Sequence, residues 1–180
     1  MNEIDALEFW QAQGPAYFRE LSTLGALPDQ VILRLMQGGR VIALDAGERL
    51  YSAGERSESF YIVLSGRVNT FMPRHDGGWT LARSHETGDD MGFVPMIALR
   101  DRPASTTADV DSVVLEISCA QFIELHQRDP EAFGVILLNL GRGMARAIIS
   151  MATVLAEQDN QLHAAYSSSP GSVTSRKTEK

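Results

Sequence analysis

The sequence predicts an α+β fold: N-terminal helices, then a small barrel or jelly roll of short strands, then a long C-terminal helix. Three observations support this prediction. Apolar residues recur at helical spacing before residue 38, short runs of branched and aromatic residues follow, and residues 132–156 are almost uncharged. With 180 residues and 44% hydrophobic content, the chain is long enough for one domain with a substantial core.

Residues 1–38 are expected to form an N-terminal segment of two or three short helices. Apolar residues recur at three- and four-residue intervals from Leu24 to Met36, and Pro28-Asp29 is typical of a helix start.

Residues 39–128 are expected to form the barrel. The predicted strands are short runs, most of them separated by turns that contain glycine: 41–44, 49–52, 60–64, 68–72, 79–84 and 112–118. Short strands with turns at regular spacing are typical of a small barrel or jelly roll. Cys119 follows the last strand, and we expect it to be a small buried residue.

Residues 129–166 are expected to form one long helix. Asp129-Pro130 is typical of a helix start, and the only charged residues between Ala132 and Ala156 are Arg142 and Arg146. An apolar stripe follows the helix: Phe133, Leu137, Leu140, Met144, Ile148, Met151 and Leu155. Further apolar residues widen it: Val135, Leu138, Ile149 and Ala152. Beyond the helix, residues 167–180 are predicted to be a disordered polar tail.

The apolar surface of this helix is wider than packing on one barrel face requires. We therefore expect a homodimer through the helix, with Gly141 and Gly143 allowing close approach. The alternative is that the whole surface packs inside one subunit. No membrane span is expected, because the two arginines leave uncharged stretches shorter than the ~20 residues that a span requires. Ser150 and Thr153 could contact a ligand or bond back to helix carbonyls.

Composition excludes several classes of function. The net charge of −7 provides no basic field for nucleic acid, and a single cysteine excludes a disulfide framework or an iron–sulfur cluster. The first ten residues contain acids but no basic residue, which is unlike a signal or transit peptide, so a cytoplasmic location is expected.

Catalytic patterns are also absent from the sequence. The four histidines, His75, His85, His126 and His163, are scattered, and we expect surface or loop positions for all of them. This weakens a cupin-like metal enzyme, which remains a remote alternative, as does a haem sensor with His75 or His85 as ligand. The sequence contains neither a Gly-x-Ser-x-Gly elbow nor a phosphate loop. We expect no enzymatic activity.

One segment, residues 88–108, has the chemistry of a phosphate cradle. It joins a glycine-bounded turn, a short helix-like stretch, and Arg102 ahead of small residues. Glycine and alanine allow backbone N–H groups to approach an anion, and a guanidinium supplies charged hydrogen bonds.

The order of motifs along the chain resembles the cyclic nucleotide-binding domain family, in the form of the sensor domains of the catabolite activator protein class. The motifs are Gly47-Glu48, Gly54-Glu55, the strand from Phe60 to Val68, Gly88-Asp89-x-x-Gly92, Arg102-x-Ala104-Ser105 and Asp129-Pro130. The resemblance covers about residues 20–157. It implies an eight-stranded jelly roll (double-stranded β-helix) with a phosphate-binding cassette, and a long helix that dimerises and caps the base.

The resemblance also implies a nucleotide site formed by Gly92, Phe93, Arg102, Pro103, Ala104 and Ser105, with cyclic AMP, cyclic GMP or cyclic di-GMP as the ligand. Phe93 stands where the family has a glutamate for the ribose hydroxyl, and an unpaired buried hydroxyl costs about 1–3 kcal/mol. Phe93 could instead stack on a base or fill a vacated pocket. Pro103 stands where the family has Ser or Thr, and it offers neither a hydroxyl nor an N–H.

The expected function is therefore a stand-alone, non-enzymatic regulatory protein, a sensor or adaptor with a degenerate nucleotide site and a protein partner. The alternative is a ligand-free interaction module of the same fold. Direct DNA binding is not expected, because no basic winged helix-turn-helix follows the long helix.

Overall fold

The computed structural model describes residues 1–167 and begins with a strand in the segment expected to be helical. This strand, β1 (Asn2–Ile4), pairs antiparallel with β2 (Arg40–Leu44). The expected helices follow as α1 (Ala6–Gln13), α2 (Pro15–Glu20) and α3 (Asp29–Gly38). A strand of three residues is too short to show an alternating pattern, so only its pairing with β2 defines it.

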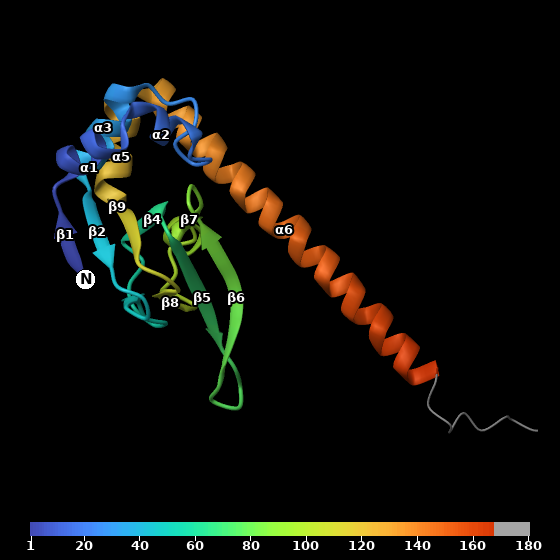
Figure 1. The fold of residues 1–180 in the computed structure, drawn as a ribbon. Coiled ribbons are helices and arrows are strands. Elements are labelled where there is room, and N and C mark those ends of the chain that lie inside the picture. Colours follow the sequence, from blue (N-terminus) through green and yellow to red (C-terminus); the bar gives the residue numbers. More distant parts are fainter. Residues whose placement is uncertain (168–180) are drawn as a thin grey trace, which may run out of the picture. The chain divides into compact units, whose positions relative to one another are not determined.

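The strands form two antiparallel sheets (Figure 1). The first sheet has the order β1-β2-β9-β4-β7, and the second has the order β3-β8-β5-β6. The remaining strands are β3 (Arg49–Tyr51), β4 (Ser59–Ser65), β5 (Arg67–Pro73), β6 (Trp79–Glu86), β7 (Asp90–Met91), β8 (Ser105–Ala108) and β9 (Ser112–Ser118). Buried residues from both sheets form one hydrophobic cluster, so this part of the core lies between the sheets.

All six predicted strands are present, as β2 to β6 and β9, and the α+β class is confirmed. The described residues contain nine strands where eight were expected. The additional strands β1, β7 and β8 have two to four residues each, and β8 consists of Ser, Thr and Ala. Their pairing partners, rather than their own composition, make them strands.

The barrel segment also contains two helices. The short helix-like stretch expected within residues 88–108 is present as α4 (Phe93–Ile97), which follows β7, whereas α5 (Cys119–Arg128), which begins directly after β9, was not expected. The Ser118 hydroxyl caps α5 by accepting a hydrogen bond from the Gln121 N–H at 3.2 Å. Cys119 is therefore the first residue of a helix and is exposed, so the expectation that it is buried was wrong.

The predicted long helix is confirmed as α6 (Pro130–Ser167). The chain divides into two compact units, Met1–Gly143 and Met144–Lys180, so α6 contributes to both. In the first unit, α6 buries Ala132, Ile136 and Leu140. Of the expected stripe, Leu140 is buried in this unit and Leu137 is 40% exposed. In the second unit, Thr153 donates a hydrogen bond to the Ile149 carbonyl at 3.1 Å, one of the two roles considered for it.

The segment Pro130–Asn160 of α6 contains an 18-residue window of mean hydropathy 1.4, long and apolar enough to cross a membrane. The two arginines therefore do not by themselves exclude a membrane span. Core helices of water-soluble proteins can have the same length and hydropathy. The absence of a membrane span and the cytoplasmic location stay predictions. The predicted tail, apart from Ser167, lies outside the described residues.

Candidate functional site

The Arg102 side chain points into the protein and is 3% exposed. Its backbone is fixed on both sides by the loop after β3: the Arg102 N–H donates to the Glu55 carbonyl, and the Gly54 N–H donates to the Arg102 carbonyl, both at 2.8 Å. This pairing positions the guanidinium without help from a ligand.

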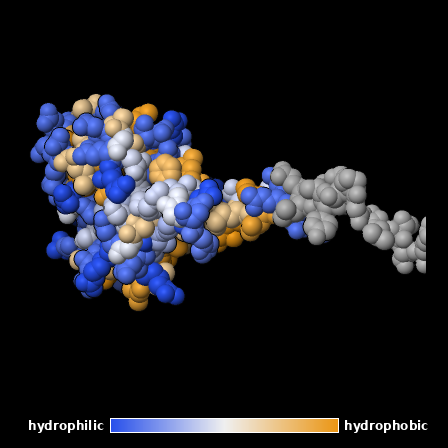
Figure 2. Space-filling model, turned by 90° about the horizontal axis from the view of Figure 1, so that it is seen from below, coloured by the Kyte–Doolittle hydropathy of each residue, from blue (hydrophilic) through white to orange (hydrophobic). Residues whose placement is uncertain are grey.

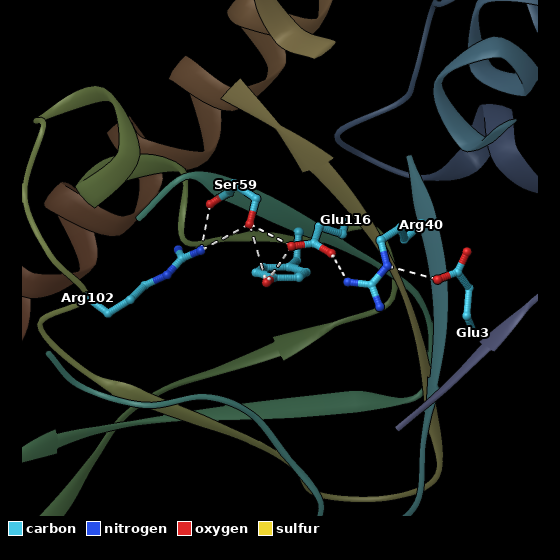
Figure 3. A network of polar contacts seen from close by, with 6 residues as sticks. Glu3, Arg40, Ser59, Arg102 and Glu116 are labelled. Carbon is cyan, nitrogen blue, oxygen red and sulfur yellow. Dashed lines mark hydrogen bonds and ion pairs between the residues drawn. The ribbon is translucent and has the colours of Figure 1, made fainter. Parts of the chain in front are cut away.

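The guanidinium is already hydrogen-bonded by the protein (Figure 3). Nη2 donates to the Ser59 carbonyl at 2.7 Å and lies 3.4 Å from the Ser59 hydroxyl. Nη1 donates to the Gly92 carbonyl at 3.1 Å. Two of the five guanidinium N–H groups are therefore bonded to backbone carbonyls of the protein itself.

Two tyrosine rings lie against the guanidinium. Its central carbon is 4.3 Å from the ring centre of Tyr51 on β3 and 5.5 Å from that of Tyr61 on β4. The two rings stack at 5.7 Å, and both residues are 7% exposed. The contacts are cation–π interactions, which are strongest when water is excluded. Aromatic side chains therefore occupy space directly beside Arg102.

Gly92 is required by the position of Arg102. Its φ of +76° is in the left-handed region, and a Cβ at this position would lie 2.0 Å from Arg102 Nη1. A side chain here would displace the guanidinium. The sequence prediction thus brings together two residues, Gly92 and Arg102, that do contact each other.

Phe93 lies apart from Arg102. It is fully buried against Phe60 and Phe122, with ring centres at 5.3 and 5.8 Å. Neighbouring residues on a strand point to opposite faces, and Tyr61 faces Arg102, so Phe60 and its partner Phe93 lie on the other face of β4. Phe93 is thus positioned neither to stack on a base beside Arg102 nor to fill that space.

The remaining predicted residues form the loop beside Arg102. Pro103 is exposed, whereas Ala104 and Ser105 are buried. The Ser105 hydroxyl accepts a hydrogen bond from the Ala53 N–H at 3.0 Å. Arg100, a second guanidinium nearby in the sequence, is exposed. Of these two guanidinium groups, that of Arg102 is therefore the buried one.

A chain of polar contacts connects Arg102 to the surface (Figure 3). Glu116 Oε1 accepts hydrogen bonds from the hydroxyls of Ser59 and Tyr61 at 2.8 and 2.9 Å, and Oε2 accepts one from Arg40 at 2.9 Å. Arg40 in turn bonds to Glu3 of β1 at 2.9 Å. Burial, with a contribution from Glu116, raises the pKa of Tyr61 to about 12, so its hydroxyl stays protonated and donates.

A second cluster of polar side chains, Thr70, His85 and Thr106, lies on β5, β6 and β8. The Thr70 hydroxyl is 3.0 Å from His85 Nε2 and 3.1 Å from the Thr106 hydroxyl. His85 is 5% exposed, so the expectation of a surface position was wrong for this histidine. Burial lowers its pKa to about 4, with Arg83 acting in the same direction. In the described part of the chain, no three His, Cys, Asp or Glu side chains gather as metal ligands would.

Four members of this site were not predicted from the sequence: Tyr51, Tyr61, Ser59 and Glu116. The alternation along β4 could have indicated that Tyr61 and Phe60 face opposite sides. The contact between Tyr51 and Arg102 depends on how two distant segments meet, and no local signal shows it.

The protein is thus a two-sheet α+β domain with a long C-terminal helix, and it holds a buried arginine between its strands. Residues 41–129 match the family model of the cyclic nucleotide-binding domain, and they belong to that family. The family predicted from the motifs is therefore confirmed.

Solved structures of the same fold include a cyclic nucleotide-binding domain from Methylobacillus flagellatus, 17% identical with a TM-score of 0.73, where the match covers 87% of this chain and 88% of that one. The catabolite activator protein of Thermus thermophilus is 19% identical with a TM-score of 0.65, and the match covers 77% and 63% of the two chains.

A sequence relative is patatin-like phospholipase domain-containing protein 7 of Rattus norvegicus, 30% identical over 98 residues. The match spans 54% of this chain but only 7% of that protein.

Proposed function

We propose that this chain is a non-enzymatic regulatory protein, a sensor or adaptor, whose nucleotide site is degenerate and held closed by its own backbone carbonyls and tyrosine rings. The observation that supports this most strongly is the set of contacts of Arg102: two carbonyls accept its hydrogen bonds, and Tyr51 covers its face. The nucleotide-binding residue of the family is thus retained, but it serves the protein itself.

A cyclic phosphate that approached the guanidinium would compete with these contacts. A hydrogen bond to a charged group contributes about 1.5–3 kcal/mol, and a cation–π contact contributes about 0.5–2 kcal/mol. Phe93 provides no carboxylate for the ribose, and Pro103 provides no N–H for the phosphate. The ligand therefore has fewer new contacts with which to offset what it displaces.

The mechanism we propose is a population shift between this closed state and an open one. If the open state is rare, the apparent affinity for a nucleotide falls in proportion to its population. A protein partner that binds the outside of the closed domain does not need the site to open. Regulation would then pass through surfaces of the domain rather than through nucleotide concentration.

Thermal unfolding with millimolar cyclic AMP, cyclic GMP and cyclic di-GMP tests this proposal. A ligand at 100 times its Kd stabilises the folded state by about 2.7 kcal/mol, which is a clear rise in Tm. We expect no rise with any of the three. A rise that disappears in Arg102→Ala but persists in the exposed control Arg100→Ala would show an open sensor site and contradict closure.

We also propose that the chain forms a homodimer through α6. In the second unit, Ile148, Ile149, Met151, Val154 and Leu155 are between 48% and 67% exposed, and an apolar helix of this kind is stabilised by packing rather than by propensity. Light scattering coupled to size exclusion would measure the number of chains per particle. A particle of one chain at micromolar concentration would contradict the dimer.

A further inference from the structure

Apolar side chains lie along α6 beyond Met144 (Figure 2), and their spacing in the sequence arranges them in two stripes. We define stripe one as Met144, Ile148, Met151 and Leu155, and stripe two as Ala145, Ile149, Ala152 and Ala156. In each stripe the residues are separated by steps of four, three and four. This is the 3.5-residue repeat of helices that pack side by side in a coiled coil, so each stripe fits another helix.

The two stripes together are too wide for one neighbour. At about 100° per residue, the apolar arc from Val154 through stripe one to Ile149 covers roughly 220° of the helix. One core-facing stripe needs roughly 100°. The polar side is confined to the remaining arc, which contains Arg146, Ser150, Thr153 and Glu157. A dimer through stripe one would leave stripe two exposed to water.

Stripe two is stripe one displaced by one residue, so the two directions differ by about 100°. In a bundle of four helices, each helix meets two neighbours at roughly right angles. We propose that α6 packs against the α6 helices of two other copies at once, so that the chain assembles as a bundle of four chains. This goes beyond the proposed dimer, which accounts for only one of the stripes.

The charges beside stripe two indicate that its neighbour is another copy of this chain. Arg146 and Glu157 are eleven residues apart, so they lie on the same side of the helix, about 60–80° beyond Ile149. An antiparallel copy puts the same flank of both helices side by side, so that Arg146 of each chain lies on the same edge of the contact as Glu157 of the other. The surface is therefore self-complementary, as a twofold interface requires.

The composition of stripe two fits the same partner. Three of its four residues are alanine, which allows two helix backbones to approach closely. A lipid partner fits less well, because Arg146, Ser150 and Thr153 lie along the same helix and would enter the apolar layer with it.

Native mass spectrometry of the full chain, supported by light scattering, tests the proposal. We expect particles of four chains for the unaltered protein and of two chains for Ile149→Glu/Ala152→Glu, which places charges in stripe two. Ser150→Glu, at the position of the polar arc farthest from both stripes, is the matched control and should keep four chains. Arg146→Glu should weaken the larger assembly, and the double variant Arg146→Glu/Glu157→Arg should restore it. Thermal unfolding of each variant would show that the first unit still folds.

The outcomes separate this proposal from the dimer. Particles of two chains that are unchanged by Ile149→Glu/Ala152→Glu would overturn the four-chain bundle and leave the dimer intact. Particles of one chain would overturn both. Co-sedimentation with phosphatidylcholine vesicles that is lost in Ile149→Glu/Ala152→Glu would show that lipid covers stripe two, and would overturn the proposal as well. None of these results depends on whether a nucleotide binds.

Discussion

Removing the Arg102 side chain distinguishes a site that is closed on itself from a site that waits for a ligand. A buried guanidinium kept for an absent anion lowers the free energy of unfolding, because its desolvation is not compensated. Replacing such a residue by alanine would stabilise the protein or leave it unchanged. A guanidinium that is hydrogen-bonded by its own protein stabilises the fold, and Arg102→Ala would then destabilise it.

The contacts of Arg102 allow the size of the effect to be worked out. Its removal leaves the carbonyls of Ser59 and Gly92 without these donors, at about 1–3 kcal/mol for each buried acceptor. The cation–π contact with Tyr51 adds about 0.5–2 kcal/mol. Because these contributions are not additive, we expect a loss of about 3–5 kcal/mol in the free energy of unfolding.

Urea denaturation provides the measurement. With a slope of about 2 kcal/mol per molar urea, the midpoint of Arg102→Ala should fall by about 1.5–2.5 M while the slope stays constant. Arg100→Ala, an exposed control, should remain within about 0.5 kcal/mol of the unaltered protein. A midpoint for Arg102→Ala equal to or above that of the unaltered protein would refute the closed-site reasoning.

Two further predictions follow from the same interior. Gly92→Ala should lower the free energy of unfolding by at least about 2 kcal/mol in urea denaturation, because the new Cβ would lie 2.0 Å from Arg102 Nη1 and the backbone φ is left-handed. A loss below about 1 kcal/mol, as in an exposed turn, would contradict this contact. Burial lowers the pKa of His85 to about 4 from 6.5, so between these values the unfolded chain binds more protons, and stability should fall by about 3 kcal/mol as the pH is lowered from 6.5 to 4. Stability measured across this range should show a weaker dependence in His85→Gln, and an unchanged dependence would exclude His85 as its source.

Local patterns in the sequence identify the main elements of this fold. The six predicted strands and the long helix have strong periodicity or clear turns at their ends, and all of them are present. The elements that were missed are defined by tertiary contacts. β8 consists of Ser, Thr and Ala between β3 and β5, and its pairing with these two strands makes it a strand.

In the candidate site, too, local sequence patterns predict some contacts, whereas others depend on how distant segments pair. The spacing of the cassette motif is local, so Gly92 and Arg102 could be predicted as neighbours. The partners of Arg102 come from β3 and β4, more than 40 residues earlier in the chain, and the register of these strands decides which side chains face it. His85 is buried for the same reason, because it pairs opposite the buried Val68 on β5. Such register is not encoded in any single segment.

In the proposed closed state, Ser59 links Arg102 to the neighbouring strands of the sheet. Its carbonyl accepts from Arg102, while its hydroxyl donates to Glu116, which also accepts from Arg40 on β2. Opening the site therefore requires Arg102 to release a strand that is itself held by a neighbouring ion pair. A change in the pairing of β2 with β9 would act on Arg102 through Glu116 and Ser59. An interaction at the outer strands of this sheet thus has a physical route to the interior that does not require a nucleotide.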